Sequence, residues 1–278
     1  MKFTKMSGLG NDFIVINALE INKEIEYKNL AVKLCNRHFG IGADGLLIVE
    51  PSGIADIRMR IFNSDGTEAE MCGNGARCFA KYVYERGIVK KEKMTVETLS
   101  GVIMSEIIFN NGIVDKVRVS MGNPIFKASE IPVKTEKKSF INEPIKLNGR
   151  TYNITSVLIG VPHTIIFVDA IDENMVLNIG PIVEKLHIFP RGTNVDFVKV
   201  EDRNNITVRT WERGAGLTLA CGSGACASAV AAAVTEKTDR NVYVHFKCGD
   251  LFVEWSEYNN VYLTGKAEEV FRGETSTV

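Results

Sequence analysis

The chain has 278 residues, of which 45% are hydrophobic and 24% charged, with a formal net charge of −1. These values are typical of a globular protein with one large domain or two of about 130 residues. The balanced charge argues against binding to nucleic acid or to anionic lipid. No apolar run reaches the roughly 18 residues of a membrane-spanning helix, and residues 1–6 lack the apolar stretch of a secretory signal. We therefore expect a cytoplasmic protein whose six cysteines stay reduced.

In the first half of the chain, short β-branched segments alternate with glycine and Asn-Gly turns, a pattern typical of strands. An amphipathic helix is expected from about Lys28 to Arg37, and a second helix after Cys72 with Gly87 as its stop. Strands are expected at residues 13–17, 46–49, 57–62, 94–99, 102–109 and 114–120.

The second half follows a similar order of elements. We expect a short helix from Pro181 to His187 and a longer one from Gly224 to about Glu236, which is apolar nearly all round and should be buried. Strands are expected at residues 164–169, 195–200 and 206–211, followed by a hairpin over 242–255. Residues Phe126 to Asn148 are the least patterned and are expected to bridge the halves.

Two segments repeat each other without a gap, 149 positions apart: residues 57–76, with Cys72, and residues 206–225, with Cys221. An isoleucine, an arginine, an aromatic residue, the cysteine, two glycines and an alanine fall in register. The duplication predicts an α+β fold of two pseudo-symmetric lobes, each a curved, mostly antiparallel sheet wrapped around a central helix that begins just after a cysteine. We expect an N-terminal lobe at 1–122, with 266–278 packing back on it, and a C-terminal lobe at 123–265.

A Cys-Gly-x-Gly segment that opens a helix favours a particular chemistry. Its exposed N–H groups and the helix dipole attract an anion such as a carboxylate, and they should lower the pKa of the neighbouring thiol. If the two lobes face each other, Cys72 and Cys221 lie on opposite sides of one substrate. That arrangement suits removal and return of a proton at an α-carbon, because the amides stabilise the charge that develops on the carboxylate.

The other four cysteines are expected to be buried packing residues, namely Cys35, Cys78, Cys226 and Cys248. The spacings from Cys72 to Cys78 and from Cys221 to Cys226 do not suit a metal site, so neither structural zinc nor any other metal is expected. A Gly-x-Gly piece alone is a weak signal, since dinucleotide-binding fingerprints look similar. The in-register duplication is what gives the pair its weight.

Several motifs together resemble the diaminopimelate epimerase family over nearly the full length of the chain. They are Gly8–Phe13, Phe62–Gly66, Cys72–Cys78, Glu212–Gly216 and Ala220–Cys226. The related proline racemases share the pair of cysteines but not this full set. The resemblance implies interconversion of LL- and meso-diaminopimelate for lysine and peptidoglycan precursor synthesis, without cofactor or metal, by a cytoplasmic homodimer.

By this resemblance, Cys72 and Cys221 are the acid/base pair, one as thiolate and one as thiol. The reacting carboxylate would be held by the amides around Gly73-Asn74 and Gly222-Ser223. Recognition of the distal, non-reacting end would fall to Asn11, Asn63, Asn194, Glu212 and Arg213. His163 and Glu212 would support cysteine protonation.

The chain departs from the family pattern at Val161, where asparagine is usual, and at Gly45, where some members carry glutamine. Both departures bear on substrate recognition rather than on the cysteine pair. Two alternatives stay open: a racemase or epimerase of another amino acid in the same fold, and a non-catalytic amino-acid-binding or redox-responsive protein. His163 could also be a packed core histidine, and Glu212 with Arg213 an exposed ion pair.

Overall fold

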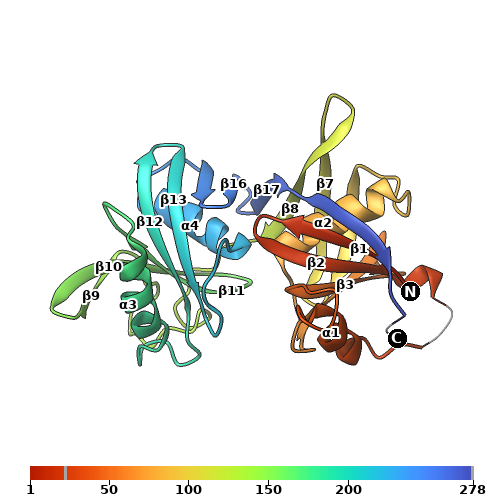
Figure 1. Cartoon of the computed structure of the whole chain (residues 1–278). Helices are drawn as coiled ribbons and strands as arrows, with labels where there is room; N and C mark the ends of the chain where they lie inside the picture. Colours follow the sequence, from red (N-terminus) through yellow and green to blue (C-terminus); the bar gives the residue numbers. More distant parts are fainter. Residues whose placement is uncertain (22–23, 277–278) are drawn as a thin grey trace. The chain divides into compact units, whose positions relative to one another are not determined.

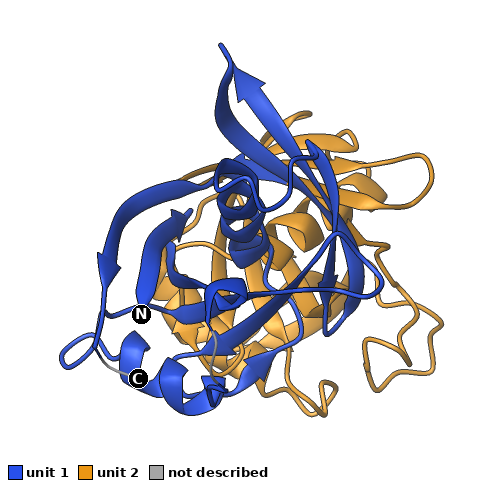
Figure 2. Cartoon of the chain, turned by 90° about the vertical axis from the view of Figure 1, so that its right-hand side faces the viewer, with its two compact units in different colours: residues 1–120, 264–278 blue, residues 121–263 orange. Residues whose placement is uncertain are grey.

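The computed structural model describes residues 1–21 and 24–276, and the chain divides into two compact units (Figure 2). The first unit combines residues 1–120 with 264–278, and the second is the continuous stretch 121–263. Within the described residues, no helix is long and apolar enough to cross a membrane.

The first unit is a curved sheet that packs on the central helix α2 (Gly73–Glu85) (Figure 1). Its strands run in the order β18-β1-β2-β3-β4-β6-β7-β8, with the short β5 beside β4. Only β2–β3 and β4–β6 are parallel among these pairs. The strands are β1 (Lys2–Gly8), β2 (Asn11–Asn17), β3 (Gly45–Glu50), β4 (Ile57–Asn63), β5 (Glu68–Ala69), β6 (Lys93–Thr98), β7 (Gly101–Asn110), β8 (Ile113–Gly122) and β18 (Glu268–Glu274).

The second unit repeats this plan around the helix α4 (Gly222–Val234). Its order is β9-β10-β11-β12-β13-β15-β16, with the short β14 beside β13 and parallel pairs at β11–β12 and β13–β15. The strands are β9 (Glu143–Leu147), β10 (Arg150–Ile159), β11 (Val161–Phe167), β12 (Asn194–Asp202), β13 (Asn205–Glu212), β14 (Gly216–Leu217), β15 (Asn241–Phe246), β16 (Gly249–Trp255) and β17 (Val261–Lys266), the last of which continues into the first unit.

The helices bury the residues that the sequence pattern selects. In α1 (Tyr27–Cys35) the buried positions are Leu30, Ala31, Leu34 and Cys35, at the helical spacing expected. Helix α4 is buried from Ala225 through Ala232 because small apolar residues surround its axis. The expected α+β class with a mostly antiparallel sheet is confirmed, and each central helix begins directly after a cysteine.

Two expectations about local structure are wrong. The helix expected from Pro181 to His187 is instead α3 (Glu173–Glu184), which begins earlier because Asp172 caps it: its Oδ1 accepts the N–H of Asn174 at 3.1 Å. Cys248 is exposed rather than buried, since it lies in the turn between β15 and β16. Strand β10, ten residues long, was not expected at all.

The weakly patterned stretch from Phe126 to Asn148 contributes directly to the second unit. It holds β9, which pairs with β10, and it buries several side chains in the core. These are Ala128, Ile131, Val133, Phe140 and Leu147.

Candidate active site

The two cysteines have the same local geometry. Each is the N-cap of its helix in an extended conformation, and each sulfur accepts an amide N–H three residues on: Gly75 donates to Cys72 Sγ and Gly224 to Cys221 Sγ, both at 3.4 Å. The first N–H groups of a helix lack partners within it. Each turn therefore presents donors suited to an anion beside a sulfur.

Close packing favours glycine at the third helical position of both turns, more strongly in the second turn than in the first. A Cβ at Gly75 would lie 3.3 Å from Leu47 Cδ2, and one at Gly224 would lie 2.6 Å from Asp196 Oδ1. The two turns thus lie directly on strands β3 and β12. The strand side chain beneath the first turn, Leu47, is apolar, whereas the one beneath the second turn, Asp196, is a carboxylate. We call these strand side chains the floor of each turn.

In the first unit, Asn11 and Asn74 are neighbours. Asn74 Nδ2 donates to Asn11 Oδ1 at 2.6 Å, and Asn11 Nδ2 donates to Asp44 Oδ2 at 3.1 Å. On the other side, the buried Arg77 donates to Asn74 Oδ1 at 2.9 Å. Both amide groups are therefore held in a fixed orientation, beside Gly73 at the start of α2.

The tight turn between β1 and β2 brings Asn11 to this position. Leu9 and Gly10 have φ values of 56° and 85°, which is the positive-φ pair of a type I′ hairpin turn. A Cβ at Gly8 would come within 2.9 Å of the Asn74 carbonyl oxygen. The Gly-Leu-Gly-Asn motif thus permits both the turn and the close approach to α2.

A charged cluster supports the Asn11 end. Arg37 binds Asp12 at 2.7 Å and Asp44 at 2.8 Å, and Lys5 lies 2.6 Å from Asp12. Burial by itself raises the pKa of Asp12, but the hydrogen bonds from Arg37 and Lys5 outweigh it and hold that pKa well below its usual range. The predicted Asn63 joins a separate turn, where it donates to Thr67 Oγ1 at 2.9 Å.

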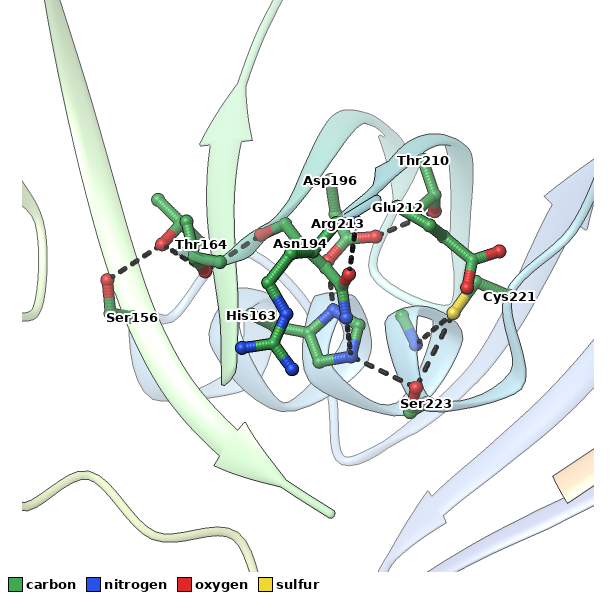
Figure 3. A network of polar contacts seen from close by, with 12 residues as sticks. Ser156, His163, Thr164, Asn194, Asp196, Thr210, Glu212, Arg213, Cys221 and Ser223 are labelled. Carbon is green, nitrogen blue, oxygen red and sulfur yellow. Dashed lines mark hydrogen bonds and ion pairs between the residues drawn. The ribbon is translucent and has the colours of Figure 1, made fainter. Parts of the chain in front are cut away.

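In the second unit, five of the predicted residues form one network (Figure 3). They are His163, Asn194, Arg213, Cys221 and Ser223. His163 Nε2 lies 3.0 Å from Ser223 Oγ, which lies 3.4 Å from Cys221 Sγ. Asn194 Oδ1 accepts the backbone N–H of Arg213 at 2.8 Å.

Glu212 is the last residue of β13, and Arg213 follows directly after it. Glu212 accepts a hydrogen bond from Thr218 Oγ1 at 2.6 Å, and the exposed Arg213 guanidinium donates to the carbonyl of Arg191 at 2.7 Å. They form no ion pair with each other in the structure, so the alternative of a simple Glu212–Arg213 pair is not supported. The roles of all these side chains toward a substrate stay predictions.

The expected lowering of the thiol pKa is wrong for Cys221. Burial raises the pKa of this thiol well above its ordinary value, and the nearby carboxylates of Glu212 and Asp196 raise it further. The contacts of the sulfur with Ser223 and Gly224 lower this pKa, by a smaller amount. Burial and the two carboxylates therefore favour the thiol form of Cys221.

Sequence reasoning missed the residues beneath the predicted ones. Asp196 is fully buried and lies 2.7 Å from His163 Nδ1, and Asp44 and Arg37 support Asn11. A usable signal existed for Asp196, because it is an acid between Val195 and Phe197 in an apolar strand, where a charge needs a partner. Among the described residues, no group of three or more His, Cys, Asp or Glu side chains is arranged to hold a metal ion.

Comparison with known proteins gives a consistent result. A family model described as diaminopimelate epimerase matches residues 3–127 and 155–270. A protein of that name from Caldanaerobacter subterraneus subsp. tengcongensis is 66% identical over 274 residues, which is 99% of each chain. Another, from Pelotomaculum thermopropionicum, is 51% identical over 99% of this chain and 98% of its own length. One from Methanococcus maripaludis is 49% identical over 99% of both.

Solved structures with far lower identity share the fold. A probable proline racemase from Agrobacterium radiobacter K84 matches with a TM-score of 0.72 at 14% identity, over 100% of this chain and 93% of that one. A hydroxyproline epimerase from Agrobacterium vitis matches with a TM-score of 0.71 at 14% identity, over 98% and 90% of the two chains.

Proposed function

This chain belongs to the diaminopimelate epimerase family, and from that membership we propose that it is an isomerase interconverting LL- and meso-diaminopimelate. The reaction serves lysine and peptidoglycan precursor synthesis. The observation that supports it most is the matched pair of N-cap cysteines, each with its sulfur on an amide at the start of a buried or partly buried helix. Inversion at one α-carbon needs two such acid/base groups.

The proposed mechanism uses one sulfur as base and the other as acid. A thiolate takes the α-proton from one face, and the opposite thiol delivers a proton to the other face. The conjugate acid of a thiolate has a pKa of about 8.5, so the thiolate is far less basic than the carbanion. The amides of Gly73-Asn74 and Gly222-Ser223 then supply electrostatic stabilisation as charge moves onto the substrate carboxylate.

Recognition of the distal amino acid centre is assigned in this proposal to Asn11, Asn63, Asn194, Glu212 and Arg213. Arg213 can hold a carboxylate with two parallel N–H donors, and Glu212 suits an ammonium group. The present hydrogen bond from the Arg213 guanidinium to the Arg191 carbonyl is one that a substrate carboxylate could replace. The family pattern also leads us to propose that the protein is cytoplasmic and forms a homodimer. Sedimentation analysis would test the dimer by measuring the mass of the particle.

Solvent-deuterium incorporation tests the proposed function. Incubation of the protein with LL-diaminopimelate in D₂O should place deuterium at one α-carbon and generate the meso isomer. A binding protein would exchange nothing. Exchange with another amino acid but not with diaminopimelate would assign the same chemistry to a different substrate, and Val161, which is 36% exposed where the family usually carries asparagine, would be the first position to examine.

A further inference from the structure

Asp196 is a fully buried acid in a strand whose neighbours are apolar. Its side chain has no exposed surface, and Val195 and Phe197 on either side are equally buried. A buried carboxylate is costly unless its oxygens are hydrogen-bonded. Both oxygens have partners here: Oδ2 lies 2.7 Å from His163 Nδ1, and Oδ1 accepts from Thr210 Oγ1 at 2.7 Å.

The contacts at both ends of the His163 ring define the same tautomer. A carboxylate only accepts, so Nδ1 must carry the proton that faces Asp196. At the other end, Asn194 Oδ1 accepts the N–H of Arg213, and its amide nitrogen therefore faces Nε2 at 3.4 Å. A donor facing Nε2 favours a lone pair there over an N–H. Nε2 is thus an acceptor.

This tautomer sets the direction of the contacts that lead to the sulfur. Ser223 Oγ, 3.0 Å from Nε2, donates its proton to the ring, and its lone pairs then face Cys221 Sγ at 3.4 Å. The thiol of Cys221 therefore donates to Ser223. The result is a hydrogen-bond chain that runs in one direction from Cys221 to Asp196 (Figure 3).

The first unit has apolar residues at the corresponding positions. The strand register pairs His163 with Asn194 and Asp196 with Thr210 in the second unit. In the first unit the same register pairs Phe13 with Gly45 and Leu47 with Ile61. A glycine turn can therefore be supported by strands that carry no buried carboxylate, which indicates that Asp196 serves the second cysteine rather than the fold.

We propose that Asp196 is a positioning residue that holds His163 with Nε2 free, so that the ring can take the proton of Cys221 through the hydroxyl of Ser223. In this step the S–H bond of Cys221 breaks and an O–H bond forms at Ser223, while the original O–H bond of Ser223 breaks and an N–H bond forms at Nε2. A neutral pair becomes a thiolate and an imidazolium, and the Asp196 carboxylate stabilises the imidazolium. The inference rests on the proposed function, which requires Cys221 as a thiolate in one direction of the reaction.

The charged groups that face Cys221 allow this role to be separated from a simple field effect. Glu212 and Asp196 both disfavour the thiolate directly. If Asp196 acted only as a nearby charge, neutralising it would make Cys221 more reactive. If it acts through His163, neutralising it destabilises the imidazolium and makes Cys221 less reactive near neutral pH. The two roles predict opposite signs.

Alkylation by iodoacetamide, followed at Cys221 by peptide mass spectrometry across pH, measures this sign in the full chain. Transfer to His163 needs no net loss of a proton, so the wild-type rate should have a pH-independent limb near neutral pH and rise only at higher pH. Asp196→Asn should lower that limb about tenfold, as expected for loss of a charged hydrogen-bond partner. Thr210→Val should lower it less. Thr164→Val is the matched control, since its buried hydroxyl contacts Ser156 and Thr193 instead, and it should leave the limb unchanged.

A wild-type profile without the neutral limb, or a faster neutral rate in Asp196→Asn, would overturn the proposal. Should that variant not fold, ¹⁵N NMR of the wild-type histidines decides. The chain has four histidines, and a His163→Gln variant assigns the relevant signal. His163 should be the neutral tautomer protonated at Nδ1, and protonation at Nε2 instead would contradict the chain described here. Neither measurement uses substrate, so a failure of deuterium exchange would defeat the proposed function and leave this result standing.

Discussion

The two glycine turns share a backbone and differ in what lies beneath them. Under the first, Phe13, Leu47 and Ile61 are apolar. Asn74 is held there by the buried Arg77, and Asn11 by Asp44, which pairs with Arg37. Under the second, His163, Asp196 and Thr210 occupy the matching register positions. A repeated fold therefore fixes where the sulfur lies, and the strands below it decide the electrostatic environment of that sulfur.

The largest expected effect comes from removing either sulfur. Cys72→Ala and Cys221→Ala should each lower kcat for epimerisation about 10³-fold or more, because each removes one acid/base group. Conversion of LL- to meso-diaminopimelate, with circular dichroism as a check of folding, measures this. Cys35→Ala, a buried thiol outside both turns, is the control and should affect stability only. A folded Cys72 or Cys221 variant with near-normal turnover would show that the halves do not share the chemistry.

Exchanging the floors should cost stability. Leu47→Asp places a carboxylate between Phe13 and Ile61, neither of which can donate a hydrogen bond. The free energy of unfolding in urea should fall by about 3–5 kcal/mol, as for an uncompensated buried charge. Adding Phe13→His and Ile61→Thr rebuilds the pairing of the second unit and should recover part of the loss. No recovery would mean that the register match does not carry over to side-chain contacts.

Arg213→Lys examines the recognition groups that only the second half carries. A lysine cannot reproduce the planar fork that binds a carboxylate, so kcat/KM for diaminopimelate should fall about tenfold, mainly through KM. Arg191→Lys is a matched control, because Arg213 contacts only the backbone carbonyl of Arg191. A change in kcat/KM below about threefold for Arg213→Lys would remove it from the proposed clamp.

The smallest effect concerns the charged support of the first half. The folded-state pKa of Asp12 is depressed, so its stabilising contribution is present above the unfolded-state value near 4 and is lost as pH falls below it. Between about pH 5 and 2, the free energy of unfolding should fall in both proteins, but by about 1 kcal/mol less in Asp12→Asn than in the wild type. The difference is small because Arg37, the partner of Asp12, is half exposed. Equal acid sensitivity in both proteins would contradict this role.

Much of this arrangement could be predicted from the sequence because it rests on local signals. Periodicity located α1 and α2, and the duplication located both cysteines at helix starts. Strand β10 was missed although its partners β9 and β11 directly precede and follow it in the chain. Helix α3 was misplaced because its start depends on the cap at Asp172.

The environment of the site was less predictable for a physical reason. The helix N-terminus suggested a lowered pKa for Cys221, but burial and two carboxylates raise this pKa. Glu212 was predicted from the sequence, but Asp196 lies on β12, and the strand register places it beside Thr210. Local sequence thus predicts the donor groups at a turn, whereas the electrostatic environment of the sulfur also depends on burial and on Asp196 from another strand.

The pairing of β1 with β18 has a consequence for synthesis of the protein. These strands come from opposite ends of the chain, and the amino group of Met1 donates to the carbonyl of Thr275 at 2.7 Å. During translation, the whole of the continuous second unit is therefore synthesised before β18, the strand that completes the sheet of the first unit. Until then β1 has one unpaired edge, which is the kind of surface that recruits other chains. The first half of the gene is thus translated early but its product finishes folding last.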